Sequence, residues 1–145
     1  MVALEKNFLR KLLREYSLVI VDANREVLYY SNESGIKPIV EAVLSIGKQI
    51  DGNIVADRVI GKAAALVIAN RNPMYVFGSI MSKSAEEFLR KRGINHDFDI
   101  MVDAIRAKTG ELCPFERLVL EIDDPKEALK KIVKRLNITK NTMPF

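Results

Sequence analysis

The chain is poor in the residues that covalent cross-links, metal centres and membrane spans require. Among its 145 residues are one cysteine, Cys113, and one histidine, His96, and there is no tryptophan. A single cysteine excludes an intramolecular disulfide, and with one histidine it makes a poor metal-ligand set, so we expect no metal and no cofactor. The longest apolar run, residues 63–69, is far shorter than the roughly 20 residues that cross a bilayer. We therefore expect no membrane span.

The start of the chain also lacks the apolar stretch of a signal peptide. Its first residues, MVALEKNFLRKLLREY, carry charges throughout, which predicts a cytoplasmic protein. A length of 145 residues with 48% hydrophobic and 29% charged residues suffices for one core without disulfides. We expect a single domain over 1–145, made of an added N-terminal helix at 1–16, a core at 17–136 and a tail at 137–145.

The basic surplus is not distributed as in a nucleic-acid-binding module. The net charge is +4, but the surplus lies in the two terminal segments, 3–16 and 124–145, where few aromatic residues stand among the basic ones. Nucleic-acid modules place Lys and Arg on one face together with stacking aromatics or a reading helix. The pattern is typical of solvated helix faces, and we expect no nucleic-acid partner.

Apolar spacing predicts a helix, a hairpin and then alternating strands and helices. Leu4, Phe8 and Leu12 recur at helical spacing, followed by β-rich runs at 17–22 and 27–30. The pattern predicts further helices at 34–47, 59–69, 84–93 and after Pro125, and strands at 53–56, 74–80 and 96–101. A hairpin followed by β-α alternation predicts a three-layer α/β/α domain with one mixed sheet, its later strands parallel.

Three short motifs resemble a family of small prokaryotic proteins of unknown function. They are GIKPIVE at 35–41, VADRVIGKAAA at 55–65 and CPFE at 113–116. The resemblance covers about residues 18–130 and implies a cytidine-deaminase-like fold, with the first helix as an addition. A zinc deaminase needs a His or Cys ligand near a Glu, followed by a P-C-x-x-C pair. The corresponding segments, 34–38 and 57–62, contain neither His nor Cys, so the resemblance implies the fold without the zinc chemistry.

Two predicted helix starts suggest ligand binding. A helix N-terminus favours anions, yet Lys37 and Lys62 stand close to two of them, and Gly35 and Gly61 would let a ligand approach the backbone. We interpret these four residues as binding a small anionic ligand that carries phosphate or carboxylate. The alternative is packing alone, with Gly61 bringing a helix close to the sheet and the lysines extending into water.

Three further residues are candidates for acid–base or nucleophilic chemistry. Asp57 follows a predicted strand, at the sheet edge where α/β proteins bind ligands, although it could also cap the next helix. Cys113 and Glu116 flank Pro114 with the spacing of a capping box. A thiol is a weak cap, so Cys113 is a candidate nucleophile; against this, buried cysteine is a common core residue, and Glu116 would oppose its ionisation. We assign no role to His96.

Two classes of function follow from these residues. The first is a zinc-free enzyme of unknown reaction in which Asp57, Cys113 and Glu116 act on an anionic substrate. The second is a non-catalytic module for ligand sensing or for assembly, including a homo-oligomer formed through the N-terminal helix. An enzyme should bring Asp57, Lys62, Cys113 and Glu116 into one pocket, whereas a module could bury Cys113 in the core.

Overall fold

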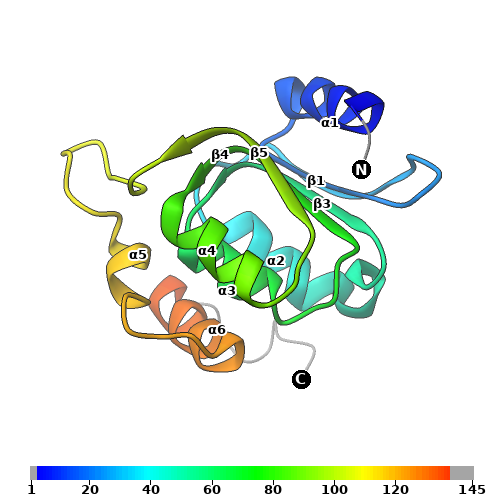
Figure 1. The fold of residues 1–145 in the computed structure, drawn as a ribbon. Helices are drawn as coiled ribbons and strands as arrows, with labels where there is room; N and C mark the ends of the chain where they lie inside the picture. The colour runs from blue at the N-terminus through cyan, green and yellow to red at the C-terminus, as the bar shows by residue number, and fades with distance from the viewer. Residues whose placement is uncertain (1–2, 138–145) are drawn as a thin grey trace.

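A five-stranded mixed sheet forms the centre of the computed structural model, which describes residues 3–137 (Figure 1). Its strand order is β2-β1-β3-β4-β5. The strands are β1 (Leu18–Val21), β2 (Val27–Ser31), β3 (Ile54–Ile60), β4 (Tyr75–Ser82) and β5 (His96–Val102). β1 pairs antiparallel with both β2 and β3, and β3, β4 and β5 pair in parallel. The hairpin and the parallel later strands confirm the predicted mixed sheet.

Helices cover both faces of this sheet, unequally. Within residues 3–137, one face carries α1 (Ala3–Glu15), and the other carries α2 (Lys37–Ile46), α3 (Lys62–Ile68) and α4 (Lys83–Lys91) (Figure 1). The last helix, α6 (Pro125–Leu136), packs against α2 and α3 rather than on the sheet. Two short helices complete the chain, the 3-10 helix η1 (Gly47–Ile50) and the five-residue α5 (Pro114–Leu118). The α/β architecture with helices on both faces agrees with the sequence pattern.

The strand alternation divides the core between these two faces. On β1, Val19 and Val21 pack under α1, while Leu18 and Ile20 face the other helices. Burial of such apolar side chains contributes about 1.5–3 kcal/mol each, so both faces add to stability. The alanine-rich α3 lies completely within the larger core, because Ala63, Ala64 and Ala65 let it approach the sheet closely.

The predicted amphipathic helix docks on its own sheet. Leu9 and Leu13 are buried against β1, β3 and β4, and Phe8 and Leu12 are partly buried beside them. The side chain of Leu4 lies outside the described residues. The protein's own strands therefore cover Leu9 and Leu13 of this stripe.

The expected boundary between the strand at 53–56 and the helix at 59–69 is wrong. β3 continues through Asp57 to Ile60, and α3 begins only at Lys62. The extra strand residues are held by the parallel neighbour β4, with Val59 opposite Ile80 and Ile60 opposite Met81. Asp57 therefore lies within β3, at the position where the pairing with β1 ends.

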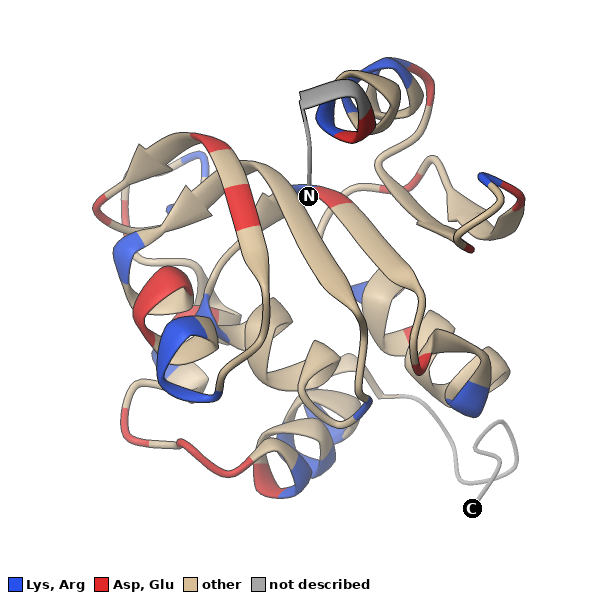
Figure 2. Cartoon of the chain, turned by 45° about the vertical axis from the view of Figure 1, so that its right-hand side comes forward, with Lys and Arg blue, Asp and Glu red and all other residues tan. Residues whose placement is uncertain are grey.

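Charged residues of both signs are interspersed on the outer faces of the terminal helices α1 and α6 (Figure 2). On α1, Lys6 and Arg10 form ion pairs with Asp97 and Asp99 of β5. No helix within residues 3–137 has the length and apolar character of a membrane span.

Candidate functional site

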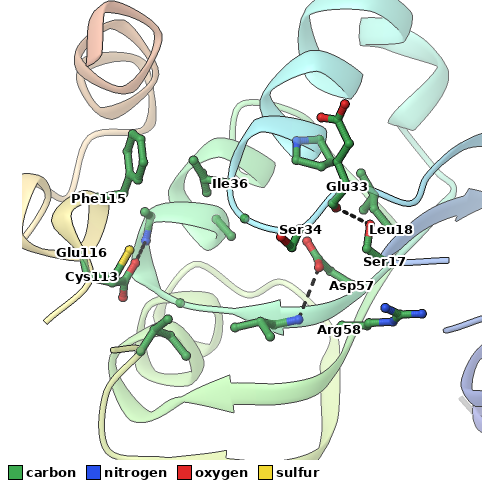
Figure 3. Close-up of a pocket in the computed structure, with 17 residues that line it drawn as sticks. Ser17, Leu18, Glu33, Ser34, Ile36, Asp57, Arg58, Cys113, Phe115 and Glu116 are labelled. Carbon is green, nitrogen blue, oxygen red and sulfur yellow. Dashed lines mark hydrogen bonds between the residues drawn. The ribbon is translucent and has the colours of Figure 1, made fainter. Parts of the chain in front are cut away.

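A cavity of about 180 Å³ lies where β3, the loop before α2 and the segment around α5 meet (Figure 3). Leu18, Ile36, Ile105 and Phe115 contribute apolar surface to it, and the first turn of α3 contributes Ala63 among others. An empty volume of this size suffices for one ring-sized molecule, since an engineered cavity of about 150 Å³ takes up benzene.

Five of the seven predicted site residues line this one cavity. They are Gly35, Asp57, Gly61, Cys113 and Glu116. Cys113 and Glu116 lie on one side and Asp57 on the other, so the residues come from strand β3 and from a segment more than fifty positions away (Figure 3). Asp57 and Cys113 therefore line the same cavity, as expected from the sequence.

The two predicted lysines, Lys37 and Lys62, do not line this cavity. The ammonium of Lys62 lies 3.1 Å from the carbonyl oxygen of Leu120 and 3.1 Å from a carboxylate oxygen of Asp123. Lys37 is exposed at the first residue of α2, and neither lysine lines the cavity. The expectation of an anionic ligand thereby loses the positive charges on which it rested.

Asp57 is one of three buried polar residues that line the cavity, with Ser17 and Glu116. Its side chain is 8% exposed, and one carboxylate oxygen accepts a hydrogen bond of 3.3 Å from the amide of Val59. Burial raises the pKa of Asp57 to about 7, although the amides of Val59 and Arg58 and the Arg58 charge act in the opposite direction. A carboxyl group with a pKa near neutrality can both give and take a proton at physiological pH.

The guanidinium of Arg58 does not neutralise its neighbour Asp57. It points away from the cavity and donates hydrogen bonds to the carbonyl oxygens of Leu13 and Arg14, at 2.8 and 3.2 Å (Figure 3). These are carbonyls of the last turn of α1, where a cation is favourable. Arg58 thus joins α1 to the strand that carries Asp57.

Glu116 is bonded to a different helix from the one expected. Its two carboxylate oxygens accept hydrogen bonds from the amides of Lys62 (2.9 Å) and Ala63 (2.8 Å), at the start of α3. Burial raises the pKa of Glu116, and these two amide hydrogen bonds oppose that effect. The carboxylate of Glu116 therefore occupies the position at this helix start where the sequence suggested a ligand anion.

Gly61 has a steric role in this arrangement. A Cβ atom at Gly61 would lie 2.5 Å from a carboxylate oxygen of Glu116, which is closer than such atoms approach. The backbone of Gly61 is extended, with φ −96° and ψ −179°, so its conformation does not itself require glycine. Close approach of Glu116 to the backbone is the reason for a glycine here.

Cys113 stands at the position before α5, as the capping pattern suggested. Its side chain makes no cap hydrogen bond, and it is half-buried at the cavity rather than in the core. The capping box of 113–116 does not form, because Glu116 is engaged with α3. Of the two alternatives for Cys113, a core position is therefore excluded.

Ser34 is a cavity residue that the sequence reasoning did not single out as a candidate. It lies in the loop before α2, with its hydroxyl on the Asp57 side of the cavity (Figure 3). The adjacent Gly35, with φ +91°, turns the chain at this place. The sequence feature that could have identified Ser34 is its position next to a glycine in a turn.

A catalytic zinc ion of the deaminase kind does not fit these residues. The segments at 34–38 and 57–62 offer no His or Cys. Within residues 3–137, no group of three or more His, Cys, Asp or Glu side chains is arranged to hold a metal ion. Glu116 is already held by two backbone amides.

Fold and cavity together define a small α/β protein whose single mixed sheet carries an acidic cavity at one edge. The model of a family described as a domain of unknown function (DUF1893) matches residues 6–136, and the chain belongs to this family. It is similar to the crystal structure of a DUF1893 family protein (TM1506) from Thermotoga maritima, with a TM-score of 0.84 and 28% identity. That similarity covers 93% of this chain and 92% of the other. The curated proteins include no match.

The family match bears on the first helix. It begins at residue 6, inside α1, whereas the sequence resemblance began at about residue 18. Most of α1 therefore belongs to the region that the family shares, in agreement with its buried contacts on the sheet.

Proposed function

We propose that this protein binds a small ring-sized molecule in the cavity, with Asp57 as its polar anchor. The observation that carries the proposal is a carboxyl group, 8% exposed, that lines a largely apolar cavity and is not paired with a cation. A buried charge without a partner costs stability, and such costs cluster at functional sites. Binding pockets typically combine apolar walls with a few convergent polar groups.

The charges around the cavity favour a ligand that donates hydrogen bonds. Three acidic residues, Glu33, Asp57 and Glu116, line it. Arg58 also lines it, but its guanidinium is bonded to carbonyls of α1, and neither lysine is among the lining residues. An anion would meet Asp57 without a compensating cation, while an amide or a protonated nitrogen would satisfy it. We accordingly replace the anionic ligand expected from the sequence by an uncharged or cationic one.

A matched ligand series tests this choice. Benzamide, benzamidine and benzoate share one ring and nearly one shape but are neutral, cationic and anionic. We expect benzamide and benzamidine to raise the melting temperature of the wild type, since a ligand at ten times its Kd stabilises by about 1.4 kcal/mol. Asp57→Asn should weaken the benzamidine effect, whereas the control Asp103→Asn, at an exposed aspartate, should not. Stabilisation by benzoate alone would overturn the proposal.

Acid–base catalysis at the same cavity is the second candidate. It is supported by the pKa of Asp57 at about 7 and by the thiol of Cys113 across the cavity. Incubation with a metabolite mixture, followed by mass spectrometry, should show consumption of a compound by the wild type and by Asp103→Asn but not by Asp57→Asn. Equal consumption by Asp57→Asn would exclude this mechanism.

The alternatives from the sequence have less support. An assembly module would use the apolar stripe of α1, but Leu9 and Leu13 of this helix are buried against the protein's own sheet. The cytidine-deaminase-like assignment stays a proposal for the architecture. The hairpin-led mixed sheet with helices on both faces supports it.

A further inference from the structure

Residues 103–118, called the flap here, connect β5 to the buried Val119 and form one side of the cavity. Ile105, Cys113, Phe115 and Glu116 of the flap line the cavity. The segment leaves the end of β5 as a loop, includes α5 and leads toward α6 (Figure 1). The flap therefore covers a site whose other walls belong to β3, the first turn of α3 and the loop before α2.

The hydrogen bonds of the flap are mostly internal. The amide of Ala107 donates to the carbonyl of Glu111 (2.8 Å), and that of Cys113 donates to the carbonyl of Ile105 (3.0 Å). A β-bridge between Arg106 and Leu112 closes the same small loop. A segment that satisfies its own backbone groups can move as a unit without leaving them unpaired.

Few contacts attach the flap to the rest of the described chain. At its start, Asp103 pairs with Lys83 at 3.0 Å, but both side chains are largely exposed, and such pairs contribute little. Its apolar residues Phe115 and Leu118 pack against the main core but, like Ile105, are only partly buried. Directly after the flap, Val119 is fully buried and fixes the chain.

Apart from this partial apolar packing, the strongest contact that holds the flap closed is that of Glu116. Its carboxylate accepts the amides of Lys62 and Ala63, at 2.9 and 2.8 Å, and this charged pair of bonds is buried. Hydrogen bonds to a charged group are stronger than neutral ones. Gly61 leaves the space that this carboxylate occupies.

We propose that the flap opens to admit the ligand and that Glu116, bonded to the start of α3, is the latch that keeps it closed. The purpose of the movement rests on the proposed binding function, but the movement itself does not require a ligand. Release of the latch uncovers Cys113 and the cavity while the core around Val119 stays packed.

The single cysteine provides a direct assay of opening. Labelling by a thiol reagent such as 5,5′-dithiobis-(2-nitrobenzoic acid) reports Cys113 alone. Glu116→Gln keeps the size of the side chain, but its NH2 group then faces one of the backbone N–H groups of Lys62 and Ala63, so that one hydrogen bond is lost. Gly61→Ala keeps the charge and displaces the carboxylate by contact. Each should raise the labelling rate by about tenfold, the shift expected when a charged hydrogen bond is lost.

The comparison has to separate accessibility from thiol ionisation. Rates are therefore taken at the plateau of each variant's pH profile, where the thiol is fully ionised. The control Glu111→Gln removes an exposed acidic residue of the flap itself and should label as the wild type does. Unchanged plateau rates in folded Glu116→Gln and Gly61→Ala would overturn the latch.

The wild type gives a second, independent measurement. Hydrogen exchange of the Lys62 and Ala63 amides should proceed by a local opening that leaves the amide of Leu66, deeper in α3, protected. Exchange of all three amides by global unfolding alone would contradict the proposal. Both measurements use the unliganded protein. If the ligand series fails, the proposal of a moving flap is therefore unaffected, and if the flap does not move, the proposal that Asp57 binds a ligand is unaffected.

Discussion

Replacing Asp57 by Asn should stabilise the protein, and more strongly at pH 8 than at pH 4.5. Burial raises the pKa of Asp57 from 3.8 to about 7 in the folded protein. Between these two values the unfolded chain has released the proton that the folded chain still holds, so stability falls as pH rises across this window. Above pH 7 this loss of stability is complete and no longer changes with pH. Asparagine has nearly the same shape and does not ionise, so it removes the loss.

The magnitude follows from the size of the shift. About 3 pKa units at ~1.36 kcal/mol each set a ceiling of roughly 4 kcal/mol on the stabilisation at pH 8. Water entering the cavity beside the charged group lowers this figure, and we expect about 2–3 kcal/mol. For a protein of this size, that corresponds to a rise in Tm of roughly 5–10 °C.

Urea unfolding at the two pH values measures the effect. At each pH, the free energy of unfolding of the wild type is subtracted from that of the variant. The value at pH 4.5 is then subtracted from the value at pH 8, so that the contributions of other titrating groups cancel. Asp103→Asn is the control, because the hydrogen bond from Lys83 lowers the pKa of exposed Asp103 instead of raising it. If Asp57→Asn destabilises the protein equally at both pH values, the carboxyl group is not strained by burial and the reasoning fails.

Three further predictions concern the scaffold. Leu9→Ala should reduce the free energy of unfolding measured in urea by about 2–5 kcal/mol, because the Leu9 side chain is fully buried between α1 and the sheet, and no loss would show that α1 is loosely attached. Arg58→Ala should cost about 1–2 kcal/mol by freeing the last carbonyls of α1, and Arg58→Lys should restore only part of it. The hydrogen bond from His96 holds the pKa of Glu86 below its usual value, so its stabilisation is present above pH 4.5 and lost at lower pH. Glu86→Gln should therefore cost about 1 kcal/mol at pH 6 and less at pH 3, with an equal cost at both refuting the ion pair.

The helices and the sheet were largely predictable because their signals are local. The spacing of Leu9 and Leu13 with their neighbours is set by one helix, and the runs on either side of residues 23–26 are joined by a tight turn. Such patterns depend on residues close in sequence, which the chain itself displays. The mixed sheet followed from the alternation of these elements.

The end of β3 was not predictable for a physical reason. Arg58 and Val59 are exposed, and an exposed pair after a short apolar run is equally compatible with the first turn of a helix. Their strand conformation depends on pairing with β4, whose Ile80 lies opposite Val59. Parallel pairing joins residues distant in sequence, and nothing in the local pattern records it.

The partners of the charged residues were unpredictable for the same reason. Glu116 has the spacing of a local capping box, yet it bonds to amides at Lys62 and Ala63. Lys62 stands at a helix start, yet its ammonium pairs with Asp123. The sequence identified five residues that meet at the cavity, but it could not determine which polar groups there are already satisfied by other parts of the chain.

Amide chemical-shift mapping with benzamidine tests the central claim, that Asp57 anchors a ligand in this cavity. Titration of the isotope-labelled wild type should produce saturable shifts concentrated at Ser34, Asp57 and Ala63, which line the cavity. The same titration of Asp57→Asn should require a markedly higher concentration for the same shifts, by about tenfold for the loss of one charged hydrogen bond. Shifts located elsewhere on the protein, or identical titrations of the two proteins, would contradict the account.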